Sequence, residues 1–356
     1  MTDVTLRATK GSPLTHTEMD NNQVATRSGR KNMIIGGNFD TNPWQRGTAF
    51  TAVANGAYTA DRFLMGLIGT AVVDHDKIAD APSVAQAGFV VSNCLSVDVT
   101  TADAAIAATD KYSVIYMMEG YDWAQVAQND FVISFWHKHT KTGTYCVAVS
   151  SQPTPDRSYV AEYTQSVSDT WEKATIKVTA SPSAGTWNYT NGVGCNIKFS
   201  MGNGTSFHTT ADAWNTGNLQ STSNQVNALD STSNVCRFAL IQVEEGIEAT
   251  DFERRTFGEE LALCQRYYWQ GYTADHGAYK YGTAGHSIMN AGSTNFPVEM
   301  RVTPTMVVKT AGTRINCTGE TPTTGVRKGS FYVFTTVTAS GKYRISSGTY
   351  SASSEL

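Results

Sequence analysis

The feature that most constrains this fold is a series of strand-length apolar segments separated by short polar turns. The segment WEKATIKVTA, residues 171–180, alternates apolar and polar side chains, which is typical of a β-strand with one buried face. Comparable segments recur between Asn32 and Phe252, at residues 56–69, 89–99, 131–139, 144–150, 194–202 and 236–246. Strands of this length at this spacing predict an antiparallel β-sandwich, so the fold class is all-β.

Local signals add detail at two places in the sandwich. Residues 131–139 and 144–150 flank a turn that contains Lys141 and Gly143, and this arrangement predicts a hairpin. The sandwich is expected to open at NMIIGGNFD, where residues 33–35 form a short buried strand. The two glycines that follow can adopt the positive φ of a bulge or tight turn.

The chain is expected to contain four parts. Residues 1–31 have too little apolar content for a core and form an attachment segment. Residues 32–256 form the sandwich. Residues 257–270 form a linking helix, because GEELALCQRYYW has acidic residues in its first turn and good helix formers after them. Residues 271–356 form a smaller β domain.

Composition argues against several classes of protein. A net charge of −4, with no basic cluster beyond residues 27–31, argues against a nucleic-acid partner. No apolar run approaches the length of about 18 residues that a membrane span needs, and a secretion signal is absent, so membrane insertion is not expected. The six cysteines are far apart and form no CxxC pair, which favours reduced, buried thiols over a zinc site or a disulfide framework.

No catalytic signature is present in the sequence. It contains no GxSxG, P-loop or HExxH motif. His137 and His139 point to one face of a strand, but two ligands do not complete a metal site. We therefore expect no enzyme activity, no cofactor and no metal. Glycan cleavage by two carboxylates is the alternative, and the scattered acids available for it are Asp74, Asp76, Glu119, Asp122, Glu162 and Glu172.

Several blocks resemble, in order, those of bacteriophage tail-fibre and receptor-binding proteins. They are NMIIGGNFD, WQRGT, YTADRF, EEGIEATDFERRTFGEELALCQRYYW and FPVEMRVTPT. The stretch LTHTEMDNN resembles the virion-attachment stretch of such fibres, and its residues include Leu14, Thr15, Glu18 and Met19. THTE at residues 15–18 also fits a helix capping box, so a short helix is one interpretation of this stretch and a disordered tail is the other.

A second resemblance concerns the sandwich itself. The first strand, SFWHK, DTWEKATI and a closing strand near EEG are similar to jelly-roll carbohydrate-binding modules. Many such modules hold a structural calcium, here through Asn38, Asp40 or Glu245. The closing strand, however, has Arg237-Phe-Ala where that group often has an acidic residue.

Together these resemblances imply a virion fibre or spike that recognises the host cell surface, through a glycan or another receptor, without catalysis. The chain would be assembled in the host cytoplasm, reside in the virion and form a homotrimer. Residues 1–31 would contact other virion proteins. The alternative is a purely structural virion connector or head-decoration protein.

Aromatic residues in polar loops are the candidates for glycan contact. Sugars present apolar C–H faces that stack on Trp or Tyr, and their hydroxyls need amide and carboxylate partners. Two regions fit this description, and their candidates are Trp187, Tyr189 and Trp214 in the first and Trp269, Tyr272, His276, Tyr279 and Tyr281 in the second. The alternative for Trp187 and Trp214 is that they anchor long loops against the sandwich.

Overall fold

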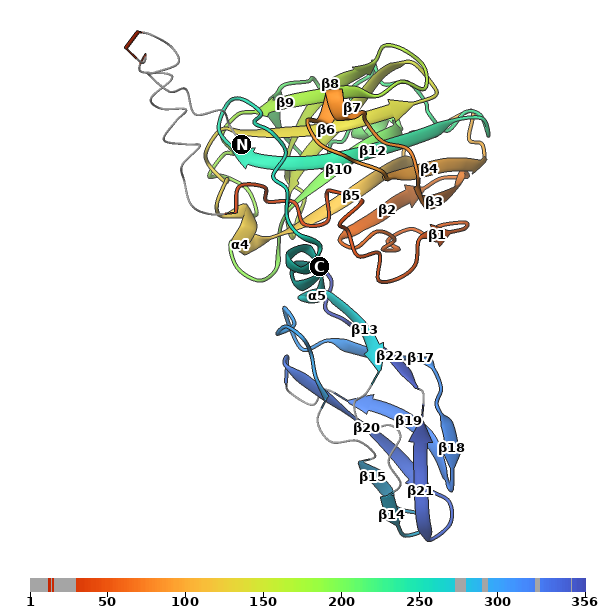
Figure 1. Cartoon of the computed structure of the whole chain (residues 1–356). Helices are drawn as coiled ribbons and strands as arrows, with labels where there is room; N and C mark the ends of the chain where they lie inside the picture. The colour runs from red at the N-terminus through yellow and green to blue at the C-terminus, as the bar shows by residue number, and fades with distance from the viewer. Residues whose placement is uncertain are drawn as a thin grey trace. The chain divides into compact units, whose positions relative to one another are not determined.

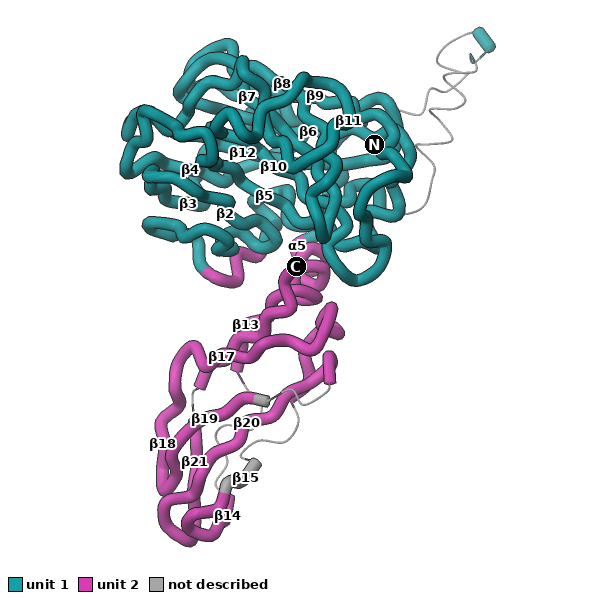
Figure 2. Tube along the Cα trace, turned by 180° about the vertical axis from the view of Figure 1, so that it is seen from behind, with its two compact units in different colours: residues 1–42, 47–256 teal, residues 43–46, 257–356 magenta. Residues whose placement is uncertain are grey.

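The computed structural model describes residues 12–13, 15, 30–272, 280–289, 294–323, 327–346 and 348–356. The chain divides into two compact units: residues 1–42 and 47–256 form unit 1, and residues 43–46 and 257–356 form unit 2 (Figure 2). Of the expected attachment residues, Thr15 is exposed, whereas Leu14, Glu18 and Met19 lie outside the described residues.

The described residues of unit 1 form twelve strands and three short helical turns. They are β1 (Ala49–Phe50), β2 (Phe63–Ile68), β3 (Val72–Ile78), α3 (Val84–Ala87), β4 (Cys94–Thr101), β5 (Lys111–Glu119), α4 (Gly120–Trp123), β6 (Phe131–His139), β7 (Gly143–Ser151), β8 (Arg157–Gln165), β9 (Glu172–Val178), β10 (Val193–Asn203), η1 (Thr205–Phe207), β11 (Ala213–Thr216) and β12 (Val235–Glu245).

These strands form an antiparallel sandwich of two six-stranded sheets (Figure 1). Sheet A has the strand order β1-β3-β4-β12-β6-β9, and sheet B has the order β11-β8-β7-β10-β5-β2. The chain changes sheet repeatedly along its length, for example from β4 to β5 and from β5 to β6. The sandwich is therefore a jelly roll, which confirms the predicted fold class.

Alternation along the strands sets the core between the sheets. In β9, Ala174, Ile176 and Val178 are buried, whereas Lys173 and Lys177 are exposed. Burial of a side chain such as Ile176 or Val178 stabilises a fold by roughly 1.5–3 kcal/mol. Strand β9 is thus placed by the same pattern that predicted it.

The predicted hairpin between residues 131–139 and 144–150 is wrong. Strand β6 pairs with β9 and β12 in sheet A, whereas β7 pairs with β8 and β10 in sheet B. The two strands face each other across the core, where the His139 and Tyr145 rings lie 4.3 Å apart between centroids. Consecutive apolar strands can bury their faces by pairing or by facing each other, and the local pattern does not distinguish these two outcomes.

The opening segment is buried but forms no regular strand. The amide of Met33 donates to the Val243 carbonyl at 2.8 Å, and the amide of Ile241 donates to the Gly37 carbonyl at 2.9 Å, so the segment runs beside β12. The preceding glycine has a φ of +76°, as predicted. A Cβ atom on Gly37 would lie 2.2 Å from the Ile241 carbonyl oxygen, so only glycine allows this approach.

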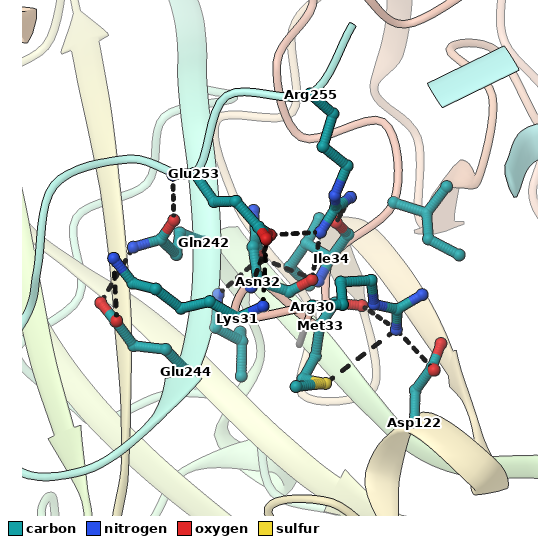
Figure 3. Close-up of polar contacts among 12 residues, drawn as sticks. Arg30, Lys31, Asn32, Met33, Ile34, Asp122, Gln242, Glu244, Glu253 and Arg255 are labelled. Carbon is teal, nitrogen blue, oxygen red and sulfur yellow. Dashed lines mark hydrogen bonds and ion pairs between the residues drawn. The ribbon is translucent and has the colours of Figure 1, made fainter. Parts of the chain in front are cut away.

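Glu253 and Arg255 lie in the segment that follows β12, and together they form a polar clamp on the opening segment (Figure 3). The Glu253 carboxylate accepts the amides of Lys31 at 3.1 Å and Asn32 at 2.8 Å. The Arg255 guanidinium donates to the Ile34 carbonyl at 2.9 Å and pairs with Glu253 at 2.8 Å. The blocks NMIIGGNFD and EEGIEATDFERR therefore contact each other, and these residues have a structural role.

Glu244 supports the clamp from β12. Its buried carboxylate accepts the Gln242 side-chain amide at 2.9 Å and the Thr250 main-chain amide at 2.8 Å. The Lys31 ammonium lies 3.5 Å from the same carboxylate (Figure 3). These contacts fix the turn that leads from β12 to the clamp.

Unit 2 begins with a helix and continues as short antiparallel strands. They are α5 (Phe257–Gln265), β13 (Tyr268–Tyr272), β14 (Lys280–Gly282), β15 (Ser287–Met289), β16 (Thr294–Asn295), β17 (Thr305–Thr310), β18 (Thr313–Ile315), β19 (Cys317–Thr323), β20 (Ser330–Val337), β21 (Gly341–Ser346) and β22 (Thr349–Ser353). Their sheets have the orders β13-β22-β17, β14-β21-β18 and β15-β20-β16, with β19 also paired to β20.

The linking helix ends earlier than predicted. Helix α5 stops at Gln265, and the aromatic run that follows enters β13, where Tyr268 pairs with Ser353 near the end of the chain. Aromatic side chains suit a strand better than a helix, and a partner so distant in sequence is not visible locally. All six cysteines of the chain are buried, and none forms a disulfide.

Candidate functional site

The structure brings together the two tryptophan-containing segments of unit 1. Trp187 lies between β9 and β10, and Trp214 lies on β11 at the edge of sheet B. Their ring centroids are 5.7 Å apart with an interplanar angle of 82°. Trp187 stacks on Trp123 at 5.2 Å, and Trp214 meets Tyr159 edge-on at 5.5 Å. We call these four residues the aromatic cluster.

The two outer rings of the cluster are both anchored and partly exposed. The Trp187 indole N–H donates to the Ala184 carbonyl at 3.3 Å, and that of Trp214 donates to the Thr179 carbonyl at 2.9 Å. Trp123 and Tyr159 are buried beneath them. Trp187 and Trp214 therefore do anchor their segments, but each leaves part of its ring surface accessible. A ligand would meet ring carbons rather than N–H donors.

Two exposed tyrosines belong to the same segments. Tyr189 is 38% exposed and Tyr121 is 53% exposed. Tyr121 lies on α4, the turn that also carries Trp123. A Cβ atom on the Gly120 of this turn would lie 2.5 Å from the Thr190 carbonyl oxygen, so the turn packs against the Trp187 segment. The sequence analysis missed Tyr121, because nothing local links it to the other aromatic residues.

Asp156 holds the Trp187 segment in place. Its carboxylate accepts the Thr186 amide at 3.0 Å, the Thr186 hydroxyl at 2.9 Å and the Ser151 hydroxyl at 2.9 Å. The amide of Thr186 is the main reason that the pKa of Asp156 lies below its ordinary value. This carboxylate is thus committed to the loop, and its geometry suits orientation of the segment rather than proton transfer.

Other acidic residues weighed above also hold loops. Asp122 pairs with the Arg30 guanidinium at 2.5 Å (Figure 3). Glu172 accepts the Val167 amide at 2.8 Å, and although burial alone raises its pKa, amide donors such as this one lower it below the ordinary value. A glycosidase pair needs two carboxyl groups that face a common substrate bond. These two carboxylates instead serve different loops.

His137 and His139 share one face of β6, as predicted, and that face is the core. His137 Nδ1 lies 2.8 Å from the Gln165 side-chain oxygen, and His139 Nε2 lies 3.1 Å from the Tyr163 hydroxyl. Burial lowers the pKa of both imidazoles, so they are neutral near pH 7. Among the described residues, no three His, Cys, Asp or Glu side chains are grouped as metal ligands would be.

The residues considered for a structural calcium are tied to neighbouring loops. The Asp40 carboxylate accepts the Ser92 amide at 2.8 Å and the Asn93 side-chain amide at 2.5 Å. The Asn38 side-chain oxygen accepts the Asp40 amide at 3.1 Å. These contacts give Asp40 a loop-fixing role in this structure.

A polar cluster on the outer face of sheet B was not anticipated from the sequence. Asn196 lies opposite Ser150 in the β10–β7 pair, and Lys198 lies on the same face of β10. All three are buried. The Lys198 ammonium donates to the Asn218 side-chain oxygen at 2.9 Å, and burial lowers the pKa of Lys198 to about 7. Alternation in β10 implied a solvated face, but a later segment covers it, since the Ser200 hydroxyl donates to the Gln220 carbonyl.

The second predicted glycan region lies in unit 2 and is only partly described. Trp269 is 7% exposed and packs against Phe296 and Phe331, each at 5.5 Å between ring centroids. It is therefore a core residue and not a ligand contact. Tyr272 and Tyr281 are 67% and 74% exposed. His276 and Tyr279 lie outside the described residues.

No protein-family model and no curated protein matches the sequence. Solved structures that match include the bacteriophage CBA120 tailspike protein 4 enzymatically active domain, at 12% identity and a TM-score of 0.30 over 58% of this chain and 23% of that one. The family 11 carbohydrate-binding module from Clostridium thermocellum in complex with a β-1,3-1,4-mixed-linked tetrasaccharide matches at 11% identity and a TM-score of 0.31. The match covers 57% of this chain and 99% of that module. TmCBM61 in complex with β-1,4-galactotriose matches at 8% identity and a TM-score of 0.29, over 61% of this chain and 100% of that one. Values this low assign neither a family nor a ligand to this chain.

Among the described residues, no helix is both long enough and apolar enough to cross a membrane.

Proposed function

We propose that this chain is a non-enzymatic glycan-binding protein whose contacts lie on the aromatic cluster and the tyrosines beside it. One observation carries the proposal: Trp187 and Trp214 come from separate segments, lie 5.7 Å apart and keep accessible ring surface. Such rings stack on the C–H faces of sugars. The exposed hydroxyls of Tyr121 and Tyr189 supply polar partners at the same end of unit 1.

We further propose that the chain is a phage virion fibre or spike that recognises the host cell surface. It is supported by the ordered blocks described above and by the LTHTEMDNN stretch. Residues 1–31 would contact other virion proteins, and a homotrimer would multiply weak sugar contacts into useful avidity. The alternative is a purely structural virion connector or head-decoration protein. It is favoured by the anchoring role of both indole N–H groups.

Binding to purified glycans tests this proposal against its alternatives. The intact chain would be measured by biolayer interferometry against a panel of bacterial surface polysaccharides. Each stacked ring contributes about 1 kcal/mol, so the double variant Trp187→Ala, Trp214→Ala should bind about 30-fold more weakly. A Tyr272→Ala, Tyr281→Ala variant measures the contribution of the second predicted region, and melting curves confirm that all variants are folded.

Three results separate the candidate functions. Loss of binding in the tryptophan variant alone supports the glycan site. Binding of no polysaccharide at saturating protein favours the purely structural role. Release of new reducing ends from a polysaccharide would instead indicate glycan cleavage.

Deletion of residues 1–31 tests the virion role independently. The shortened chain should still bind its glycan, because the aromatic cluster lies wholly within residues 123–214. It should fail to enter phage particles assembled in a cell that supplies the other virion proteins. Normal incorporation of the shortened chain would refute the attachment role.

A further inference from the structure

A separate cavity of about 150 Å³ lies on the outer face of sheet A. Ser134 and Trp136 of β6 and Lys173 of β9 line it from the sheet. Trp136 and Lys173 are direct cross-strand neighbours. Helix α3 and the segment at Phe252 line the other sides. A cavity of about this volume is known to accommodate one six-membered ring.

Three polar side chains that line this cavity have no hydrogen-bond or ion-pair partner in the described part of the protein. In the described part of unit 1, the Trp136 indole N–H, the Ser134 hydroxyl and the Lys173 ammonium make no hydrogen bond or ion pair with another side chain or the main chain. Ser134 is 5% exposed as a residue, and it lines the cavity from β6. These groups are positioned to bind something that is not part of the chain.

The backbone beside the cavity is also irregular. Strand β12 shifts register between Ala239 and Gln242. Leu240, which lines the cavity, has a φ of +51°, a conformation that is uncommon for a residue other than glycine. Bulges of this kind re-aim side chains and are frequent next to binding sites. Local strain therefore coincides with unpartnered polar groups.

The charges around the cavity define the ligand. Lys173 supplies an unpaired positive charge, and Trp136 supplies aromatic surface on the neighbouring strand. The segment after β12 forms the facing wall of the cavity. The Gln86 side chain already has hydrogen-bond partners in the protein, because it donates to the Trp171 carbonyl and accepts from the Ser83 amide. A ring with an anionic group on one side and hydroxyls on the other matches this arrangement.

We propose that this cavity is a second binding site, which takes one acidic sugar residue, a pyranose ring that bears a carboxylate. The ring lies against Trp136, the carboxylate pairs with Lys173, and a hydroxyl meets Ser134. This site is distinct from the aromatic cluster, so the proposal does not rest on the function assigned there.

Isothermal titration calorimetry of the intact chain tests the proposal. The probes are glucuronate, galacturonate and N-acetylneuraminate, with glucose as the neutral ring. Replacing Lys173 by Ala removes one charge-assisted contact and should weaken binding about tenfold or more. Lys177→Ala is the matched control, because Lys177 is also exposed on β9 but does not line the cavity.

The expected result is that at least one acidic sugar binds better than glucose by about tenfold. Its affinity should fall in Lys173→Ala, and it should be unchanged in Lys177→Ala and in the Trp187→Ala, Trp214→Ala variant. The proposal is overturned if no acidic sugar binds, if glucose binds equally well, or if the two lysine variants behave alike. Loss of binding in the double tryptophan variant alone would assign the acidic sugar to the aromatic cluster and overturn it as well.

Discussion

Replacing Glu253 by Ala should destabilise unit 1, because it removes the acceptor of two main-chain amides. The carboxylate accepts the amides of Lys31 and Asn32 and pairs with Arg255. Asn32 is 2% exposed, so water cannot readily replace the lost acceptor. An unsatisfied buried donor costs about 1–3 kcal/mol, and more when the lost partner is charged. We expect a loss of about 2–4 kcal/mol, or roughly 4–16 °C in melting temperature for a domain of this size.

The same carboxylate predicts the pH dependence of this loss. Burial by itself raises the pKa of Glu253, but the amides of Asn32 and Lys31 and the Arg255 guanidinium lower it below the ordinary value. A carboxyl group with a lowered folded-state pKa stabilises the fold above its unfolded-state pKa of about 4.3, and this contribution is lost as the pH falls through the folded-state pKa. The difference in melting temperature between wild type and the Glu253 variant should therefore become smaller at acidic pH.

Calorimetric melting of the full chain at neutral and acidic pH measures both effects. Hydrogen exchange of residues 31–35 shows whether the opening segment is released. Glu248→Ala is the matched control, since Glu248 is exposed and its carboxylate makes no contact among the described residues. Equal melting temperatures for the Glu253 and Glu248 variants would refute the role of the clamp.

Three further predictions follow from the described contacts. Burial lowers the pKa of Lys198 to about 7, so the unfolded chain binds more protons than the folded one between pH 7 and about 10. The stability of wild type against urea, measured relative to that of Lys198→Met, should therefore rise over this range, and parallel curves for the two proteins would contradict this. Gly37→Ala should melt well below Gly258→Ala, because its Cβ would meet a carbonyl oxygen at 2.2 Å and that of Gly258 meets nothing within 4 Å; equal melting would refute the close approach. Tyr272→Ala with Tyr281→Ala should change stability by less than about 0.5 kcal/mol, because both rings are exposed, and marked destabilisation would show that they are core.

Much of the fold follows from local pattern, and the failures have a common cause. Alternation in β9 predicted its buried face correctly, since Ile176 is buried and Lys177 is exposed. The pairing of β6 could not be predicted, because Phe135 satisfies the same apolar pattern in a hairpin and across the core, where it meets Phe199 at 5.0 Å. Trp269 was placed in a loop because glycines follow it, whereas its strand pairs with residues near the end of the chain.

The candidate site was predictable in its residue types but not in its assembly. The composition of the polar loops identified Trp187, Tyr189 and Trp214. Their association depends on Trp123, a buried ring on a different element that supports Trp187 from below. The cavity at Trp136 requires a cross-strand pair, a bulge and a short helix to come together. No local sequence signal contains such a combination.

The most direct test of glycan recognition by the aromatic cluster is an NMR titration of the indole N–H signals. The chain has seven tryptophans, so selective labelling yields a small and assignable set of signals. A polysaccharide fragment that binds the chain should shift the signals of Trp187 and Trp214 and leave that of the buried Trp269 unchanged. Saturating ligand that shifts neither Trp187 nor Trp214 would contradict the proposed site.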